Sequence, residues 1–259
     1  MKIFILALTV LLSSNVDAKI IHKHSATAAY NTPSYLIADE TGTIIKEQDI
    51  DLVRPIASIS KLLIAIITSE QDPSEKLDIP KFRSVQSSIP HGENKLSRIQ
   101  LLTFALVKSD NFAAQILCSN KPDCINAANN KARELGMTNT HIVEPTGLSI
   151  ENVSTASDLL KLMMYASTND TITSITKLPY AVIPTEHHLL TIHNTNPLTS
   201  TLNVVISKTG FTNPAGGCLV LAVNSPAGKK FLVLLGSKNT HTRITEMSKL
   251  YTDSQAPID

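Results

Sequence analysis

Tryptophan is absent from this chain, and aromatic residues make up only 4% of it. The hydrophobic core must therefore be built mainly from isoleucine, leucine, valine and alanine. An excess of either charge is also missing, because the formal net charge of the 259 residues is +1. A nucleic-acid binder would carry a strongly basic face, so this balance argues against nucleic acid as a partner. No repeat, low-complexity stretch or obvious linker divides the sequence.

No apolar run in the sequence is long enough to span a membrane, and the N-terminal run has a different character. Residues 3–12 are apolar apart from one threonine, follow the positive charge of Lys2, and precede the small residues of Val16-Asp17-Ala18. This order is typical of a secretory signal peptide. The run is shorter than the ~20 residues that a membrane-spanning helix needs, although an uncleaved N-terminal anchor is the alternative. We therefore expect a signal peptide at residues 1–18 and a single exported domain at residues 19–259.

Cysteine is scarce, with three residues in an apparently exported chain. Cys118 and Cys124 bracket a turn-rich loop, so we predict a small disulfide between them, although spacing alone does not guarantee the geometry. Cys218 lies in an apolar run over residues 217–221 that is typical of a buried strand. We expect it to be a packed thiol rather than a nucleophile.

The histidines do not form a clear metal-binding pattern. Their nearest cluster, His187-His188 with His193, is more typical of a strand with exposed polar positions than of a zinc site. We therefore expect neither a metal nor another cofactor.

Strand signals lie at both ends of the sequence. Residues 35–38 and 43–45, joined by a turn-like segment, predict a β-hairpin. Three strand-like runs follow late in the chain, at residues 202–207, 218–223 and 230–235. The short connections between these runs imply an antiparallel sheet, which the N-terminal hairpin could join.

Helical signals lie between these strands and after them. The nearly all-apolar run at residues 61–67 favours a buried helix beginning near Ser58, with a buried strand as the alternative. Residues 97–106 and 111–117 are further helical segments, and a closing helix is expected over residues 242–251. This order of elements predicts an α+β fold.

Three short strings carry the chemistry. They are Ser58-Ile59-Ser60-Lys61, Ser109-Asp110-Asn111 and Lys208-Thr209-Gly210. Taken alone, the first is common by chance, the second could be a helix cap and the third a turn at a strand end. A second S-x-x-K, Ser174-Ile175-Thr176-Lys177, is followed at once by Leu178-Pro179 and falls after the S-D-N, so we interpret it as a chance match. Together and in order, the three strings predict the active site of a serine acyltransferase.

Ser58 and Lys61 are three residues apart, so on a helix they share a face. A serine hydroxyl is a poor nucleophile until a base takes its proton, and Lys61 can be that base only when it is neutral. Lowering a lysine pKa from ~10.4 to ~7–8 requires an environment that contributes about 4 kcal/mol. Burial and a second cation, for which Lys208 is the candidate, would supply it.

The chain resembles the low-molecular-mass penicillin-binding proteins of the D-alanyl-D-alanine carboxypeptidase family, and within it the penicillin-binding protein 7 type endopeptidases. The resemblance extends from about residue 34 to residue 243. Beyond the three motifs it is carried by Pro55-Ile56-Ala57, Glu144-Pro145-Thr146-Gly147-Leu148-Ser149, Asn152-Val153-Ser154-Thr155-Ala156, Asn194-Thr195-Asn196 and Phe211-Thr212-Asn213. It implies a β-lactamase/transpeptidase-like fold, in which an antiparallel sheet is flanked by helices and accompanied by a mainly helical lobe.

The resemblance also implies roles for the residues that perform the reaction. Ser58 would form the acyl-enzyme, Lys61 would be its general base, and Ser109 would pass a proton to the leaving amine. The backbone N–H groups of Ser58 and Phe211 would form the oxyanion hole. The same Ser58 would be acylated by β-lactam inhibitors.

Four further residues would bind the substrate, a peptidoglycan stem peptide. Asn111 would bind the peptide stem, while Lys208 and Thr209 would hold the carboxylate beside the scissile bond. Gly210, which lacks a side chain, would let a ligand or another backbone segment approach closely.

Length and location follow from the same comparison. Carboxypeptidases of this family that carry a second, β-rich domain and a C-terminal membrane-binding helix are longer than this chain. We therefore expect a soluble periplasmic enzyme with no stable membrane anchor after signal cleavage.

Three alternatives to an endopeptidase share features of this sequence. A class A β-lactamase shares the motifs and needs a glutamate that activates water; Glu144 lies in the right interval, but Thr146-Gly147-Leu148 replaces the usual continuation, so we interpret this stretch as a structural loop. A non-catalytic wall-binding protein is disfavoured because no motif residue is missing. A carboxypeptidase is not excluded by the motifs, since terminal D-alanine and cross-linking diaminopimelate both place a carboxylate beside the scissile amide. The overall resemblance favours the endopeptidase.

Overall fold

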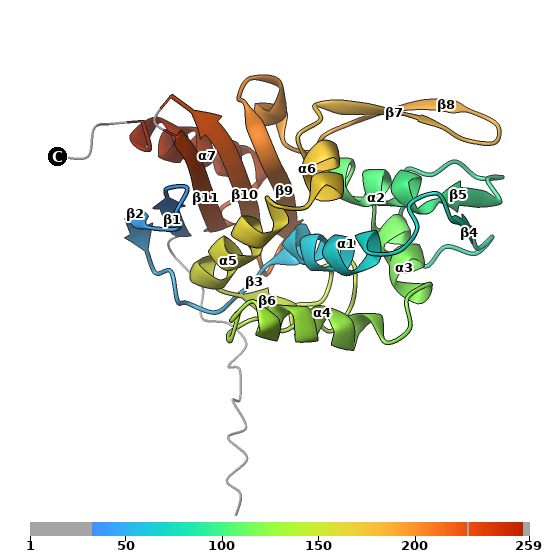
Figure 1. Cartoon of the computed structure of the whole chain (residues 1–259), viewed down its shortest axis with the longest axis horizontal. Helices are drawn as coiled ribbons and strands as arrows, with labels where there is room; N and C mark the ends of the chain where they lie inside the picture. Colours follow the sequence, from blue (N-terminus) through green and yellow to red (C-terminus); the bar gives the residue numbers. More distant parts are fainter. Residues whose placement is uncertain (1–32, 227, 256–259) are drawn as a thin grey trace, which may run out of the picture. The chain divides into compact units, whose positions relative to one another are not determined.

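Segments from the two ends of the sequence meet in one antiparallel sheet (Figure 1). The computed structural model describes residues 33–226 and 228–255, so the predicted signal peptide at residues 1–18 lies outside the described residues. The five strands lie in the order β2-β1-β11-β10-β9. Their bounds are β1 Ser34–Ala38, β2 Ile44–Gln48, β9 Val204–Thr212, β10 Gly216–Ser225 and β11 Gly228–Ser237. The prediction that the N-terminal hairpin joins the C-terminal sheet is confirmed.

Both faces of the sheet are apolar because helices cover both. Successive side chains of a strand point to opposite faces. On one face Leu219 packs in a cluster with Met247 of α7 (Thr240–Asp253). On the other face Val220 belongs to the main core, together with residues of α5 (Ala156–Ala166). This layering explains why the central strands are nearly continuous apolar runs.

Strand β9 continues further than the sequence predicts. Its pairing with β10 runs on to Thr212 opposite Gly216, so Lys208-Thr209-Gly210 lies within the strand and not at its end. A side chain on Gly217 would collide with the backbone of Asn239. Because glycine has no side chain, β10 can extend past Asn239. Because β9 is the edge strand, the motif faces the helical part of the molecule.

The helical part is arranged around one buried helix, α1, which contacts five others, α2 to α6. The bounds are α1 Lys61–Ser69, α2 Arg98–Val107, α3 Asn111–Ser119, α4 Cys124–Glu134 and α6 Asp170–Thr176. A capping box between Ser97 and Gln100 begins α2, and the Asp110 carboxylate caps α3. The predicted helices at residues 97–106 and 111–117 are confirmed, whereas α4, α5 and α6 were not predicted.

Three two-stranded sheets complete the fold: β3 with β6, β4 with β5, and β7 with β8. Their bounds are β3 Arg54–Pro55, β4 Lys76–Asp78, β5 Lys95–Ser97, β6 Val153–Ser154, β7 Tyr180–Pro184 and β8 Leu189–His193. The exposed His193 lies at the end of β8, as the strand interpretation predicts. The second S-x-x-K lies at the end of α6 with Ser174 and Lys177 both exposed, so it cannot form a buried site.

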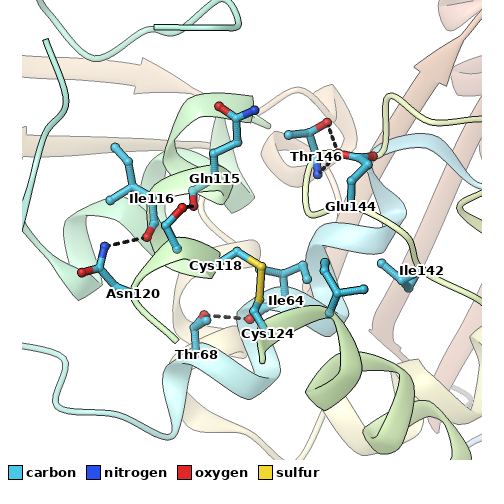
Figure 2. The surroundings of a disulfide bond; sticks show 12 residues. Ile64, Thr68, Gln115, Ile116, Cys118, Asn120, Cys124, Ile142, Glu144 and Thr146 are labelled. Atoms are coloured by element: carbon cyan, nitrogen blue, oxygen red, sulfur yellow. Dashed lines mark hydrogen bonds between the residues drawn. A yellow bond between two sulfur atoms is a disulfide. The ribbon is translucent and has the colours of Figure 1, made fainter. Parts of the chain in front are cut away.

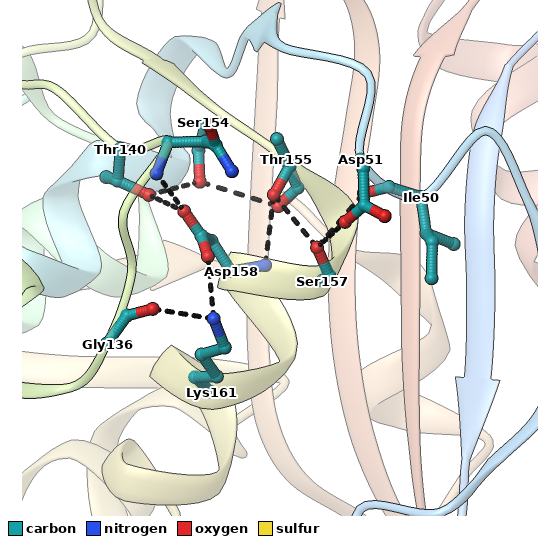
Figure 3. Close-up of polar contacts among 10 residues, drawn as sticks. Ile50, Asp51, Gly136, Thr140, Ser154, Thr155, Ser157, Asp158 and Lys161 are labelled. Atoms are coloured by element: carbon teal, nitrogen blue, oxygen red, sulfur yellow. Dashed lines mark hydrogen bonds and ion pairs between the residues drawn. The ribbon is translucent and has the colours of Figure 1, made fainter.

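A buried carboxylate fixes the segment between α4 and α5 (Figure 3). Asp158 is 1% exposed and accepts hydrogen bonds from Asn139 N at 2.8 Å, Thr140 Oγ1 at 3.0 Å and Lys161 Nζ at 3.0 Å. Burial of a charge is tolerated only when it is paired and hydrogen-bonded, as here. The contacts anchor the loop that leads to Glu144 and its neighbours.

The predicted disulfide is present. Cys118 at the end of α3 is bonded to Cys124 at the start of α4, next to Ile64 and Thr68 of α1 (Figure 2). Cys218 is buried as a free thiol, as predicted.

Among the described residues, no helix combines the length and the apolar character needed to cross a bilayer.

We predict that the disulfide stabilises the fold by restricting the unfolded chain. Replacing Cys118 and Cys124 by alanine opens a loop with a sequence separation of 6, and closing so short a loop is worth about 2 kcal/mol in the chain-entropy model. Urea unfolding should show this loss. Reductant should lower the stability of the wild type equally and leave the double variant unchanged; a wild type insensitive to reductant would contradict the prediction.

Candidate active site

Ser58 and Lys61 face each other across one tight turn. Ser58 lies in a 3₁₀ helix over Ala57–Ser60, and α1 begins only at Lys61, so the predicted start of the α-helix near Ser58 is corrected by three residues. Side chains three residues apart eclipse in a 3₁₀ helix, and the Lys61 amine lies 2.8 Å from Ser58 Oγ. Ala57 adopts a φ of +47°, a strained conformation for a residue other than glycine. Such strain directly before Ser58 is typical of functional sites.

The Lys61 amine is surrounded by three oxygen atoms. Besides Ser58 Oγ, it contacts Asn111 Oδ1 at 2.7 Å and the carbonyl oxygen of Thr146. An amide oxygen and a carbonyl oxygen can only accept hydrogen bonds. In the structure the amine donates to all three oxygens, and the Ser58 hydroxyl donates to the Thr146 carbonyl at 3.2 Å. Loss of one proton would leave the amine two N–H groups for Asn111 and Thr146 and a lone pair that can accept the hydroxyl hydrogen of Ser58.

Burial lowers the pKa of Lys61 to about 7, against smaller opposing effects of the Glu144 and Asp110 charges. The side chain is 1% exposed and lies at the start of the apolar helix α1. A protonated amine there loses its hydration, which is why the neutral form is favoured. The geometry and the pKa together give Lys61 the properties of a base near neutral pH.

A second cluster forms around Lys208 on β9. Its amine donates to Ser109 Oγ at 2.9 Å and to the Thr209 carbonyl at 2.9 Å. Burial lowers the pKa of Lys208 well below its ordinary value, and the charges of Lys61 and Arg243 lower it further. The expected repulsion between Lys61 and Lys208 therefore lowers the pKa of Lys208, whereas burial is what lowers the pKa of Lys61.

Ser109 is held by strained backbone. Its φ is +58°, and the next residue, Asp110, caps α3 through a 2.9 Å bond from Ala113 N. Asp110 also accepts hydrogen bonds from Ser87 Oγ. The three-residue S-D-N string thus contributes Ser109 to the Lys208 cluster and Asn111 to the Lys61 cluster.

Two glycines let the backbone close around Ser58. A Cβ atom on Gly210 would lie 3.0 Å from Ser58 N and 2.9 Å from Ile56 O. On Gly147, whose φ is +83°, it would lie 2.2 Å from Ala57 O. The turn carrying Ser58 is therefore in close contact with β9 and with the Glu144 loop, and any side chain at Gly210 or Gly147 would separate them.

The Glu144 carboxylate is occupied by its own loop. It accepts hydrogen bonds from Thr146 N at 2.7 Å, Thr146 Oγ1 at 2.6 Å, Gly147 N at 2.7 Å and Asn152 Nδ2 at 3.0 Å. Burial raises the pKa of Glu144, but these hydrogen bonds outweigh it and keep the pKa below its ordinary value. The structure thus supports the interpretation of this stretch as a structural loop, which presents the Thr146 carbonyl to Lys61.

The sequence motifs did not reveal three groups of the site: the Thr146 carbonyl, Thr195 and Arg243. Thr195 Oγ1 lies 2.5 Å from Thr209 Oγ1, and Arg243 Nη1 donates to the Gly210 carbonyl at 2.9 Å. The first two residues lie in segments that carry the family resemblance, which gave them no role. No sequence signal pointed to Arg243, because α7 meets β9 only through the fold.

An open cavity of about 480 Å³ lies against α3. It is lined by Pro80, Phe82, Ser84, Phe112, Gln115, Ile116, Cys118, Ser119 and Pro145. Phe112 follows Asn111 and Pro145 precedes Thr146, so the cavity adjoins the Lys61 cluster. Among the described residues, no group of three or more His, Cys, Asp and Glu side chains is placed to hold a metal ion.

The chain matches the family described as D-alanyl-D-alanine carboxypeptidase over residues 21–239. It is 38% identical to the D-alanyl-D-alanine endopeptidase of Escherichia coli (strain K12) over 238 residues, which cover 85% of this chain and 76% of that protein. It is 35% identical to the D-alanyl-D-alanine endopeptidase of Pseudomonas aeruginosa, over 84% of this chain and 75% of the relative.

The fold is similar to that of penicillin-binding protein D2 from Listeria monocytogenes, solved in an ampicillin-bound form. The TM-score is 0.78 at 28% sequence identity, and the match covers 86% of this chain and 96% of the other. The predicted β-lactamase/transpeptidase-like α+β fold is thereby confirmed.

We predict that acylation of the protein by a fluorescent penicillin depends on the neutral form of Lys61. Since the pKa of Lys61 is about 7, the second-order rate constant should rise about tenfold per pH unit below 7 and level off above it. Measurement between pH 5 and 9 tests this. Lys61→Arg, which stays protonated, should react poorly throughout; an unchanged profile in that variant would exclude Lys61 as the base.

Proposed function

The chain belongs to the D-alanyl-D-alanine carboxypeptidase family of serine peptidases, and from this we propose that it is an endopeptidase that hydrolyses D-alanyl–diaminopimelate cross-links of peptidoglycan. The observation that carries the mechanism is the contact of 2.8 Å between Ser58 Oγ and the buried Lys61 amine. Similarity to two relatives named endopeptidases supports the choice of bond.

In acylation, Lys61 takes the proton of Ser58 while Ser58 Oγ attacks the D-alanyl carbonyl carbon. The C–N bond then breaks, an ester to Ser58 remains, and the leaving amine takes up a proton. Ser109, which accepts a 2.9 Å hydrogen bond from Lys208, would relay it. Water subsequently attacks the ester, which releases the D-alanyl carboxylate and returns the proton to Ser58.

The charge that develops on the carbonyl oxygen would be bound by the N–H groups of Ser58 and Phe211. The C=O and N–H of a trans peptide point in opposite directions. The bond from Arg243 to the Gly210 carbonyl therefore fixes the direction of the Phe211 N–H. An oxyanion donor is typically worth about 2.7–4 kcal/mol in the transition state.

Substrate recognition would depend on Asn111, Lys208 and Thr209. Asn111 binds the stem peptide, while the Lys208 amine and the Thr209 hydroxyl hold the carboxylate beside the scissile amide. Gly210 admits the backbone of the Ser58 turn close to β9, which brings the nucleophile next to these carboxylate contacts. A carboxypeptidase uses the same carboxylate contacts on a terminal D-alanine, and it is the second candidate because the family bears that name.

β-Lactams would acylate Ser58 as substrate analogues, which the ampicillin-bound relative supports. Deacylation should be slow, because the Glu144 carboxylate is engaged in its loop and is not free to activate water. We also propose that the signal peptide at residues 1–18 directs export of the protein to the periplasm.

Digestion of purified muropeptides tests the proposed reaction. We expect cross-linked dimers to fall to monomers, and pentapeptide monomers to keep their terminal D-alanine. Ser58→Ala is the matched control and should cleave neither, because it lacks the nucleophile. Loss of D-alanine alone, with the dimers left intact, would refute the endopeptidase in favour of the carboxypeptidase.

Nitrocefin distinguishes this peptidase from a β-lactamase. The expected result is one slow, stoichiometric acylation, absent in Ser58→Ala. Rapid steady turnover of nitrocefin would show that the acyl-enzyme is efficiently hydrolysed and would contradict the peptidase interpretation.

A further inference from the structure

Two threonine hydroxyls meet at the carboxylate side of the site. Thr195 Oγ1 lies 2.5 Å from Thr209 Oγ1, and either atom could donate the hydrogen. Thr209 belongs to the K-T-G motif and is 4% exposed. Thr195 precedes β9 in the chain and belongs to none of the three motifs.

Thr195 is held firmly in this position from both sides. Its backbone N–H donates to the carbonyl of Val107, the last residue of α2, at 3.1 Å. The neighbouring Asn194 side chain donates to the Leu178 carbonyl at 2.8 Å, and the buried Asn196 side chain donates to Ser207 Oγ at 2.8 Å. The loop therefore connects the helical part to β9, and Thr195 has little freedom to turn away.

Counting hydrogens decides the direction of the bond between the two hydroxyls. Each hydroxyl has one hydrogen to donate and can accept through two lone pairs. A substrate carboxylate only accepts, so Thr209 must point its single hydrogen at the carboxylate. The hydrogen between the two threonines must then come from Thr195.

We propose that Thr195 is a positioning residue that donates to Thr209 and thereby directs the Thr209 hydroxyl hydrogen toward the substrate carboxylate. This inference rests on the proposed function, in which Thr209 binds that carboxylate. Thr195 itself does not touch the reacting atoms.

The surroundings make this donor important. The neighbouring Lys208 amine is 1% exposed and already donates to Ser109 Oγ and to the Thr209 carbonyl. Its pKa is lowered by burial and by the charges of Lys61 and Arg243, which weakens it as a permanent positive partner. Recognition of the carboxylate then depends more strongly on a correctly oriented hydroxyl.

The test compares Thr195→Val, which removes the hydroxyl, with Thr195→Ser, which keeps it. Two synthetic cross-link mimics are used, one with a free carboxylate beside the scissile amide and one with a carboxamide there. For Thr195→Val we expect kcat/KM on the carboxylate substrate to fall about tenfold or more, since hydrogen bonds to charged groups are strong. On the carboxamide it should change less than about twofold, and Thr195→Ser should recover most of the loss.

Acylation by benzylpenicillin and by its methyl ester gives the same comparison without peptide hydrolysis. Thr201→Val is a matched control on the described surface, because the Thr201 hydroxyl is exposed and has only a 3.4 Å contact with the Leu198 carbonyl. Thermal unfolding of each variant shows whether it is folded, and Thr195→Ser keeps the test valid if valine disturbs the loop.

Equal losses of Thr195→Val on the carboxylate and carboxamide ligands would show a merely structural contact and overturn the inference. Unchanged rates on both ligands would also overturn it. Failure of the proposed function appears in the wild type, which would then not cleave the cross-link mimics, whether or not penicillin acylates it. Failure of the inference appears only in Thr195→Val, which would then lose no more activity on the carboxylate ligand than on the ligand without a free carboxylate.

Discussion

The Lys61 amine lies almost fully buried at the start of an apolar helix, where the loss of hydration lowers its pKa to about 7. Keeping an amine there requires acceptors for its hydrogens, and Asn111 and the Thr146 carbonyl provide them. Each acceptor needs support of its own. Asp110 caps the helix that begins at Asn111, and the Glu144 loop presents Thr146. Much of the local structure therefore supports one buried amine.

The second requirement is close approach of three backbone segments. The turn that carries Ser58 lies against β9 at Gly210 and against the Glu144 loop at Gly147. The strained Ala57 is located between these contacts. Since packed interiors tolerate little displacement, the sheet and the helical part are held in a fixed relation at the point where the chemistry takes place. The Thr195 loop adds a second link between the same two parts.

The sequence predicted the α+β class, the joined hairpin, the helices α1, α2 and α3 and the disulfide, because each has a local signal such as alternation, a cap or a cysteine pair. It missed the helix start at Lys61, since 3₁₀ and α-helical turns have the same apolar pattern. It also placed the K-T-G motif at a strand end, because the extension of β9 depends on how β10 passes Asn239.

Within the site, the motif strings predicted the residues that meet around Lys61 and Lys208. The Thr146 carbonyl could not be predicted, because every residue has a carbonyl group and only the fold selects one. Thr195 and Arg243 reach the K-T-G motif from distant elements, so their spacing in the sequence carries no information about the contact.

The Glu144 loop also bears on how such a site could evolve. Its carboxylate holds the backbone that presents the Thr146 carbonyl, and that carbonyl holds Lys61. A variant that released Glu144 to activate water would gain a hydrolytic group and lose support for the base of the first step. Under the proposed function, one substitution in this loop would therefore free a carboxylate for β-lactam hydrolysis only by weakening the contact that holds Lys61.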